Sequence, residues 1–297
     1  MRKRVKSVER EDSVKMNRMH KKVLIVMCVV FSVYSLTLIF PFLWLFVNSL
    51  KTRPDFLNNS PFSFPSVGNW EWGNYVEMFQ VFPLVEMFFN SLVLSLVCPT
   101  VAVFATICAG YIVAKFVFPG KRIVYFIGLM VMFVTVSGSL VSKIRLLNAL
   151  GLMDTLMAMI LLTSSAFGFN FLLVTGTFQG VSNTYREAAM LDGAGEWRIF
   201  IQIYFPQIMP TVTAVWILQF IGQWNDYGGA YLYYNSHPTL ATGIKEISDS
   251  IESAGEYQLD YPKMFACMVI TIIPIIALFA GFQKQIMRLN MGGGIKG

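Results

Sequence analysis

The apolar residues of this chain gather in six long blocks that polar segments separate. The blocks cover residues 23–50, 88–114, 123–142, 156–176, 209–233 and 264–283. A helix needs about 20 mostly apolar residues to cross the hydrocarbon core of a bilayer, and each block provides that length. The alternating pattern of a membrane β-strand is absent from the blocks. The pattern therefore predicts an all-α integral membrane protein with six transmembrane helices.

Composition supports a membrane protein, because 55% of the 297 residues are hydrophobic and only 13% are charged. A soluble domain carries about 25% charged residues. The four cysteines all lie inside apolar blocks, and the two histidines stand far apart in the sequence. We therefore expect small buried thiols rather than a disulfide framework, and no metal site.

The distribution of positive charge predicts the orientation in the membrane. Nine Lys and Arg residues precede residue 23, three lie in 115–122, two in 177–208 and three after residue 283. The loops of the other side together hold only six of the 23. Basic residues concentrate on the cytoplasmic side, so both termini and the 177–208 loop are expected there, and loops 51–87 and 234–263 outside. The basic tail then faces anionic lipid, and no nucleic-acid partner is expected.

These features divide the chain into three expected regions. Residues 1–22 form a basic cytoplasmic tail, expected to be mobile or to lie on the membrane surface. Residues 23–286 form the transmembrane domain, and residues 287–297 a Gly-rich cytoplasmic tail. The first apolar block is too long, and its charged leader too extended, for a cleaved signal peptide.

The cytoplasmic loop 177–208 carries the clearest local signals. Thr184 and Glu187 have the spacing of a capping box, which predicts a helix that starts at Tyr185. Gly193 follows Asp192 where a helix commonly ends in the left-handed region. A helix of two turns is unstable alone, so it must pack on its own bundle or on another protein. The residues alone leave both roles open.

A second helix is predicted directly after this one. Trp197, Phe200, Ile201, Tyr204 and Phe205 recur at the spacing of one helical face. This face is expected to pack on the ends of the bundle. Two prolines, at positions 206 and 210, are expected to change the chain direction into the fifth transmembrane helix.

The fifth apolar block contains an unusual group of polar residues, Gln219, Gln223, Asn225 and Asp226, together with Trp224. Polar side chains at membrane depth normally face the bundle interior or a water-filled cavity. Gln219 and Gln223 therefore favour a substrate pathway over hydrogen bonding between helices. Packing or a helix end is favoured for Trp224 and Asp226.

Two asparagines complete the polar candidates. Asn170 in the fourth block fits a substrate pathway and interhelical packing equally well. Asn90 is expected to cap the start of the second transmembrane helix.

The 177–208 loop also resembles a known family. Glu187-Ala188-Ala189, three residues, Gly193, nine residues, then Ile203, one residue, Phe205 and Pro206 match the EAA motif of binding-protein-dependent ABC importer permeases, with Phe205 at a position that is usually leucine. The segments "WGNYVEMF", "FFNSLVLS", "LNALGLMDT", "QWNDY" and "GGGIKG" are similar to its maltose-type, MalG-like carbohydrate permease branch.

This resemblance implies a six-helix fold of the type I ABC importer permease kind, with a coupling helix that docks on a separate ATPase. The coupling residues would be Glu187, Ala188, Ala189, Asp192 and Gly193. The substrate-pathway candidates remain Gln219, Gln223, Asn170, Trp224 and Asn225.

The resemblance also implies the partners. They are a second, different permease subunit, two ATPase subunits that bind ATP and magnesium, and an extracellular sugar-binding protein that meets loop 234–263. The chain itself would bind no cofactor and would not be an enzyme. Its place would be the bacterial plasma membrane, as a multi-pass protein that imports a carbohydrate.

Two other functions compete with this interpretation. An ion-coupled secondary transporter typically needs membrane-embedded carboxylates or repeated half-helices, and only Asp226 lies deep in a late block. A membrane-embedded enzyme would need paired catalytic groups, which the apolar blocks do not contain. Neither alternative explains the loop. The chain also has no GxxxxGK[ST] segment, so ATP hydrolysis would fall to a partner.

Overall fold

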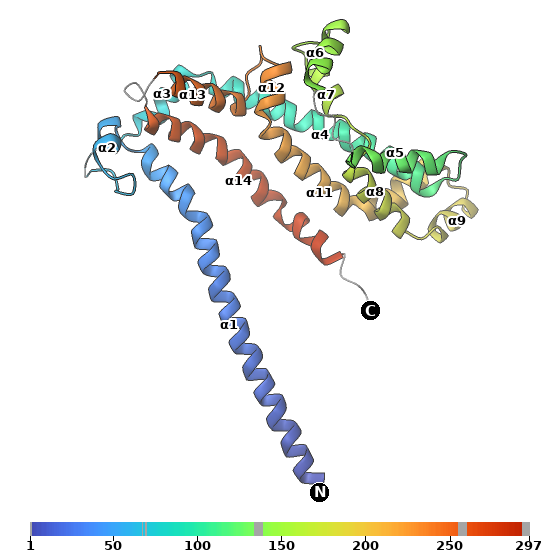
Figure 1. Cartoon of the computed structure of the whole chain (residues 1–297). Coiled ribbons are helices and arrows are strands. Elements are labelled where there is room, and N and C mark those ends of the chain that lie inside the picture. Colours follow the sequence, from blue (N-terminus) through green and yellow to red (C-terminus); the bar gives the residue numbers. More distant parts are fainter. Residues whose placement is uncertain (1, 67, 69, 134–138, 255–259, 293–297) are drawn as a thin grey trace. The chain divides into compact units, whose positions relative to one another are not determined.

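A computed structural model of the chain describes residues 2–66, 68, 70–133, 139–254 and 260–292. In these ranges the regular secondary structure is helical throughout, which confirms the all-α prediction (Figure 1). The first half contains α1 (Arg2–Ser49), α2 (Arg53–Asn58), α3 (Gly73–Val81), α4 (Leu84–Lys115), α5 (Lys121–Phe133), α6 (Ser139–Ala149) and α7 (Leu156–Thr163). The second half contains α8 (Phe169–Gly180), α9 (Thr184–Leu191), α10 (Glu196–Ile199), the π-helix η1 (Phe200–Tyr204), α11 (Phe205–Trp224), α12 (Tyr227–Tyr233), α13 (Leu240–Ala254) and α14 (Tyr261–Gly292).

Four helices in the described ranges are long and apolar enough to cross a membrane: Lys21–Ser49, Leu84–Lys115, Glu196–Trp224 and Tyr261–Gly281. The predicted count of six continuous spans is therefore not confirmed. The predicted span 123–142 includes residues 134–138, which lie outside the described residues. The predicted span 156–176 is divided between α7 and α8.

The break between α7 and α8 has a local cause. Ser164 ends α7, and the Ser165 hydroxyl donates to the carbonyl of Phe167 at 3.1 Å, a local bond that competes with helical backbone bonds. Gly168 precedes α8 with φ +107°, a conformation that side chains with a Cβ rarely adopt. Hydropathy alone does not detect these two features, and it therefore predicts one continuous helix.

The first compact unit comprises residues 1–76 and 260–269. Asn74 closes the end of α1, because its side-chain amide donates to the carbonyls of Ser49 (2.8 Å) and Lys51 (2.9 Å). The Lys51 side chain is fully buried, and its ammonium donates to the carbonyl of Ser60 at 3.2 Å. Within this unit the turn after α1 is therefore fixed by polar contacts.

Helix α1 is a single helix from Arg2, so the predicted tail boundary at residue 22 does not coincide with a helix end. The described side chains 21–43 are all exposed, although the segment from Lys21 has the highest mean hydropathy of the four spans. An apolar helix that is exposed all round within its own chain is typical of a helix that faces lipid or a partner in the bilayer.

The second compact unit comprises residues 77–259 and 270–297. Its centre is α4, which lies alongside α8 and α11 (Figure 1). One cluster of buried side chains joins these helices to α9 and α10, and its members are Val103, Ile107, Tyr111, Val174, Phe178, Ala189, Ile199, Tyr204, Ile208, Val212 and Val215. A second cluster joins α4 to α6, α7 and the end of α12, with Leu94, Cys98, Leu147, Ala158, Met159, Tyr233 and Tyr234.

Helix α5 approaches α8 closely because it carries a glycine at the contact. A Cβ built on Gly128 would lie 2.4 Å from Cε1 of Phe171 and 3.3 Å from Cδ1 of Phe167. Phe171 is fully buried, so its ring has no free space into which to move.

We therefore expect Gly128→Ala to lower the free energy of unfolding by about 1–3 kcal/mol through overpacking. Gly176, on α8, has no atom within 4 Å of an added Cβ, so Gly176→Ala is the matched control. Alanine is the better helix former, and this control should be neutral or stabilising by up to about 1 kcal/mol. Thermal unfolding of both variants in detergent measures the difference, and equal melting temperatures would contradict the packing argument.

Candidate functional site

Helix α9 presents most of its surface to solvent. Ala189 is its only buried residue among the described side chains, and it packs in the cluster between α4, α8 and α11. Leu191 is 89% exposed, and Tyr185, Glu187 and Ala188 are also exposed. A short helix with exposed apolar side chains at the end of a bundle is typical of a surface that a partner covers.

A Schellman motif ends α9, as the glycine position predicts. Gly193 has φ +79°, and its N–H donates to the carbonyl of Met190 at 3.0 Å. The N–H of Ala194 donates to the carbonyl of Ala189 at 2.9 Å. These two bonds define the motif, so the predicted left-handed end of the helix is confirmed.

The predicted capping box at the start of α9 is wrong. Thr184 is already the first helical residue, and Asn183 before it makes no side-chain cap bond. The N–H of Thr184 instead donates to the hydroxyl of Ser182 at 3.2 Å. Because Ser182 satisfies a free N–H of the first turn, the helix begins one residue earlier than predicted.

The second amphipathic helix is only partly as predicted, because it contains a π turn. The N–H of Phe205 donates to the carbonyl of Phe200, five residues back. The extra residue rotates the buried face, which comprises Ile199, Tyr204, Ile208, Val212 and Val215. Tyr204 is buried as predicted, but Trp197 is 75% exposed and Ile201 is exposed too.

The two prolines do not interrupt this helix, contrary to the prediction. Helix runs from Glu196 to Trp224 without a break. Pro206 directly follows the π turn, where the regular ladder of helical hydrogen bonds is already altered, and Pro210 lies inside α11. The second helix of the loop and the fifth transmembrane helix therefore form one continuous helix, Glu196–Trp224.

Polar side chains join the loop to the C-terminal end of α4. The ammonium of Lys115 donates to the carbonyl of Val181 at 2.6 Å and to Oδ1 of Asn183 at 3.0 Å. Arg186 forms an ion pair with Glu196. Its hydrogen bonds to the Glu196 carboxylate raise the pKa of the Arg186 guanidinium. Sequence reasoning missed these contacts. Its one available signal was Lys115, a lone charge at the end of a long apolar block.

The polar candidates in α11 have different surroundings. Gln219 and Gln223 are half-buried, and Nε2 of Gln223 is buried without a hydrogen-bond partner in the described chain. Trp224 is buried and stacks on Phe220 with ring centroids 5.8 Å apart. Asn225 is exposed and donates to the carbonyl of Ile221 at 2.8 Å. These contacts favour packing and a helix end for the last two residues.

Two further polar candidates have clear structural surroundings. The carboxylate of Asp226 accepts from the N–H of Gly229 at 2.9 Å, so it caps the start of α12 rather than the end of the fifth span. Asn170 is half-buried in the first turn of α8. Thr177 on α8 and Thr211 on α11 meet at 3.4 Å. Asn170 precedes Thr177 by seven residues and Gln219 follows Thr211 by eight, so each lies roughly 10–12 Å along its own helix from that contact.

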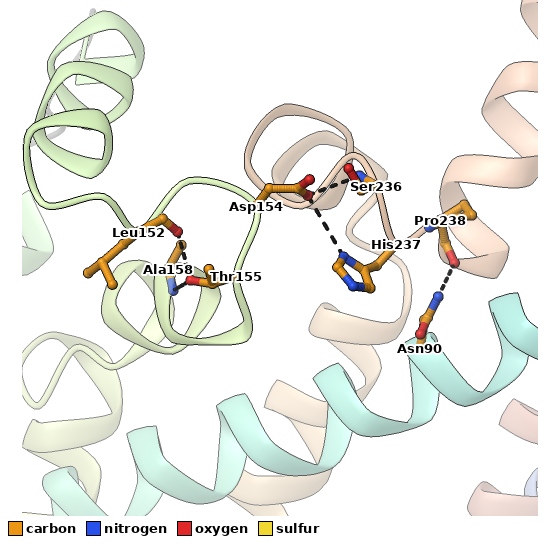
Figure 2. Close-up of polar contacts among 8 residues, drawn as sticks. All are labelled: Asn90, Leu152, Asp154, Thr155, Ala158, Ser236, His237 and Pro238. Atoms are coloured by element: carbon orange, nitrogen blue, oxygen red, sulfur yellow. Dashed lines mark hydrogen bonds and ion pairs between the residues drawn. The ribbon is translucent and has the colours of Figure 1, made fainter.

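The segment after α12 is tied to two other elements (Figure 2). Asn90 lies inside α4 and donates to the carbonyl of Pro238 at 3.0 Å, so it does not cap that helix as predicted. The hydroxyl of Ser91 accepts from the N–H of Leu240 at 2.8 Å. Figure 2 shows Asp154 reaching the same segment from the α6–α7 side.

Asp154 makes the second contact with the segment after α12, and its own backbone conformation is unusual. Its φ is +60°, and its N–H donates to the carbonyl of Tyr233 at 3.0 Å. Its carboxylate accepts from the N–H of Ser236 at 2.9 Å and lies 3.9 Å from Nδ1 of His237. Hydrogen bonding by Ser236 lowers the pKa of Asp154 below its usual 3.8. The stability that this carboxylate contributes is therefore fully present above the usual pKa of 3.8. It is lost as the pH falls through the lowered pKa of Asp154.

The four long apolar helices of the described residues indicate a multi-pass membrane protein, and α9 is exposed at the end of its bundle. Residues 17–289 match the family described as binding-protein-dependent transport system inner membrane component, and the chain belongs to this family. The family is one of transport proteins, so the expected class is confirmed.

Curated relatives cover nearly the whole chain. The diacetylchitobiose uptake system permease protein NgcG of Streptomyces coelicolor is 28% identical over 85% of this chain and 82% of its own length. The arabinooligosaccharides transport system permease protein AraQ of Bacillus subtilis is 28% identical over 90% of this chain and 94% of its own.

A solved structure has the same fold. A chain of a bacterial ABC transporter involved in the import of the acidic polysaccharide alginate aligns with a TM-score of 0.74. The alignment covers 88% of this chain and 95% of that chain, at 20% identity.

The Asp154 link generates a prediction for stability. Asp154→Ala removes the carboxylate and places alanine in the left-handed region, so we expect a loss of about 1–2 kcal/mol at neutral pH, limited by partial exposure. Asp154→Asn keeps an acceptor and tolerates that backbone conformation, so it should lose less. Thermal unfolding in detergent measures both. Equal losses would contradict the assigned backbone and carboxylate roles.

Proposed function

We propose that this chain is a membrane-spanning subunit of an ATP-driven importer that takes up a carbohydrate delivered by an extracellular binding protein. Family membership supports the dependence on a binding protein. The named relatives and the fold neighbour take up diacetylchitobiose, arabinooligosaccharides and alginate, which supports a carbohydrate as the substrate class. Diacetylchitobiose and the arabinooligosaccharides are short saccharides, which supports an oligosaccharide within that class.

The exposed surface of α9 is the observation that carries this proposal. In the proposed complex, Glu187, Ala188 and Asp192 face the partner ATPase. Ala189 packs against the bundle, and Gly193 ends the helix. The exposure of the first three and the burial of Ala189 support this division of roles. Two ATPase subunits would bind ATP and magnesium, and their closure would draw the coupling helices of two permease subunits together.

The same proposal assigns the remaining partners and the orientation. A second, different permease subunit completes the pathway, and the exposed apolar helices of this chain support such pairing. Both termini and α9 face the cytoplasm, as the positive-charge bias supports. Loop 234–263 then faces outward, towards the binding protein.

The substrate pathway in this proposal passes along α11 and α8. Gln219, Gln223 and Asn170 line it, because amide groups suit sugar hydroxyls and polar side chains at this depth normally face water. The buried amide nitrogen of Gln223, which has no hydrogen-bond partner in the described residues, supports the assignment. Trp224 and Asn225 border the outer end of the same helix.

The first test is purification of the tagged chain from its native membrane in mild detergent, followed by uptake in proteoliposomes. We expect an ATPase and a second permease to copurify, and uptake of labelled diacetylchitobiose or arabinotriose to require ATP and the binding protein. A chain that purifies alone and whose transport follows an ion gradient would favour a secondary transporter instead.

The matched pair Gly193→Asp and Gly195→Asp tests the coupling helix in the same assay. Gly195 has φ −74° and caps α10, a position that aspartate favours, whereas Gly193 has φ +79°. Strain of about 1–2 kcal/mol should displace the end of α9 in Gly193→Asp. We expect its ATPase recovery and uptake to fall by about tenfold or more, with the Gly195 variant within about twofold of wild type. Similar uptake in both variants would contradict the role of α9.

Gln223→Ala tests the pathway. It removes the buried amide, so the KM or the maximal rate of sugar uptake should change by roughly fivefold or more, equivalent to about 1 kcal/mol. ATPase copurification should stay unchanged. Gln207→Ala, an exposed glutamine near the start of the same helix, is the control. Unchanged uptake by Gln223→Ala across the substrate range would remove this residue from the pathway.

A further inference from the structure

We propose that two residues of α4, Tyr111 and Lys115, clamp both flanks of α9, so that the loop helix and α4 move as one body. Arg186 and Glu196 complete the clamp. All four are positioning residues: they transmit movement between the ATPase and the bundle without touching ATP or sugar. This inference rests on the proposed function, because it concerns how that function couples.

The first contact of the clamp lies before α9. Lys115 is only 8% exposed, and its ammonium binds the carbonyl of Val181 and the side chain of Asn183. Val181 ends α8 and Asn183 directly precedes α9, so one cation spans the junction between the two helices. The ammonium also lies 4.8 Å from the centroid of the Tyr204 ring. Lys115 therefore joins α4 to three segments at once.

The second contact lies after α9. The hydroxyl of Tyr111 donates to Oε2 of Glu196 at 3.4 Å, and Glu196 begins α10. The same carboxylate pairs with Arg186 on α9, whose guanidinium lies 5.2 Å from the centroid of the Phe116 ring. Glu196 thus links α9, α10 and α4 through one side chain.

The two contacts act together because of their spacing on α4. Tyr111 and Lys115 are four residues apart, so they occupy the same face one turn from each other. One reaches the chain after α9 and the other reaches the chain before it. A rotation of α9 about either flank would therefore break at least one contact with α4.

Apolar packing alone would hold α9 weakly. The helix has eight residues and buries only Ala189 among its described side chains. Helices this short depend on tertiary contacts for their stability. The partly buried charges of the clamp are each paired or hydrogen-bonded, which makes the contacts directional as well as attractive. Without them, we infer that α9 could follow the ATPase while α4 stays in place.

The test uses the complete complex in proteoliposomes, with the binding protein and labelled diacetylchitobiose or arabinotriose. Lys115→Met removes the first contact, and Glu196→Gln removes the negative charge that pairs with Arg186 in the second. Lys115→Arg keeps the positive charge, and Arg122→Met removes an exposed cation from the first turn of α5. Three quantities are measured: ATPase copurification, ATP hydrolysis and sugar taken up per ATP.

We expect Lys115→Met and Glu196→Gln to retain copurification and ATP hydrolysis, while sugar per ATP falls by about fivefold or more. Lys115→Arg should retain most of the sugar uptake per ATP hydrolysed, and Arg122→Met should have the same uptake per ATP as the wild type. The double variant should be no worse than the more affected single variant, because both contacts serve one clamp.

Several outcomes would overturn the proposal. One is a wild-type ratio in both single variants. Another is a loss of assembly with a normal ratio in the complexes that remain, which would indicate a purely structural role. If Lys115→Met does not assemble, the ratio of Glu196→Gln decides alone. Wild-type complex without ATP-dependent uptake would instead refute the proposed function, and the clamp with it.

Discussion

Packing of α4 against α8 and α11 is the constraint on which the rest of the second compact unit depends. The buried side of α4 extends along the helix from Leu84 to Lys115. At Gly110 the neighbouring helix comes so near that an added Cβ would lie 3.1 Å from Val174. In a bilayer, where lipid is as apolar as leucine, such close contact supplies the attraction between helices. Both hydrophobic clusters of this unit include α4.

Polar contacts then determine where the connecting segments attach to this apolar framework. At one end of α4, Asn90 and Ser91 hold the segment before α13 through backbone groups of Pro238 and Leu240. At the other end, Lys115 and Tyr111 hold the segments on either side of α9. The apolar middle of the helix gives stability, and its polar ends give direction to the loops.

The sequence was sufficient for the fold class, the family and the end of α9, because hydropathy blocks and a left-handed glycine are local signals. It was insufficient for the continuity of helices. Gly168 and the Ser165 hydroxyl bond divide an apolar block, whereas Pro206 follows a π turn and does not interrupt the helix. The π turn also exposes Trp197, which a regular helical period would bury. The clamp depends on pairs such as Lys115 and Asn183, which lie 68 positions apart and share no sequence pattern.

The division of labour around α9 has a consequence for how such a transporter can diversify. The residues that hold the helix, including Ala189, Arg186 and Lys115, are buried or half-buried, while Glu187, Ala188 and Leu191 are exposed. Substitutions on the exposed face leave the internal contacts intact. In the proposed importer, a lineage could therefore exchange its ATPase subunit through substitutions at a few surface positions, and the membrane domain and its sugar selectivity would stay unchanged.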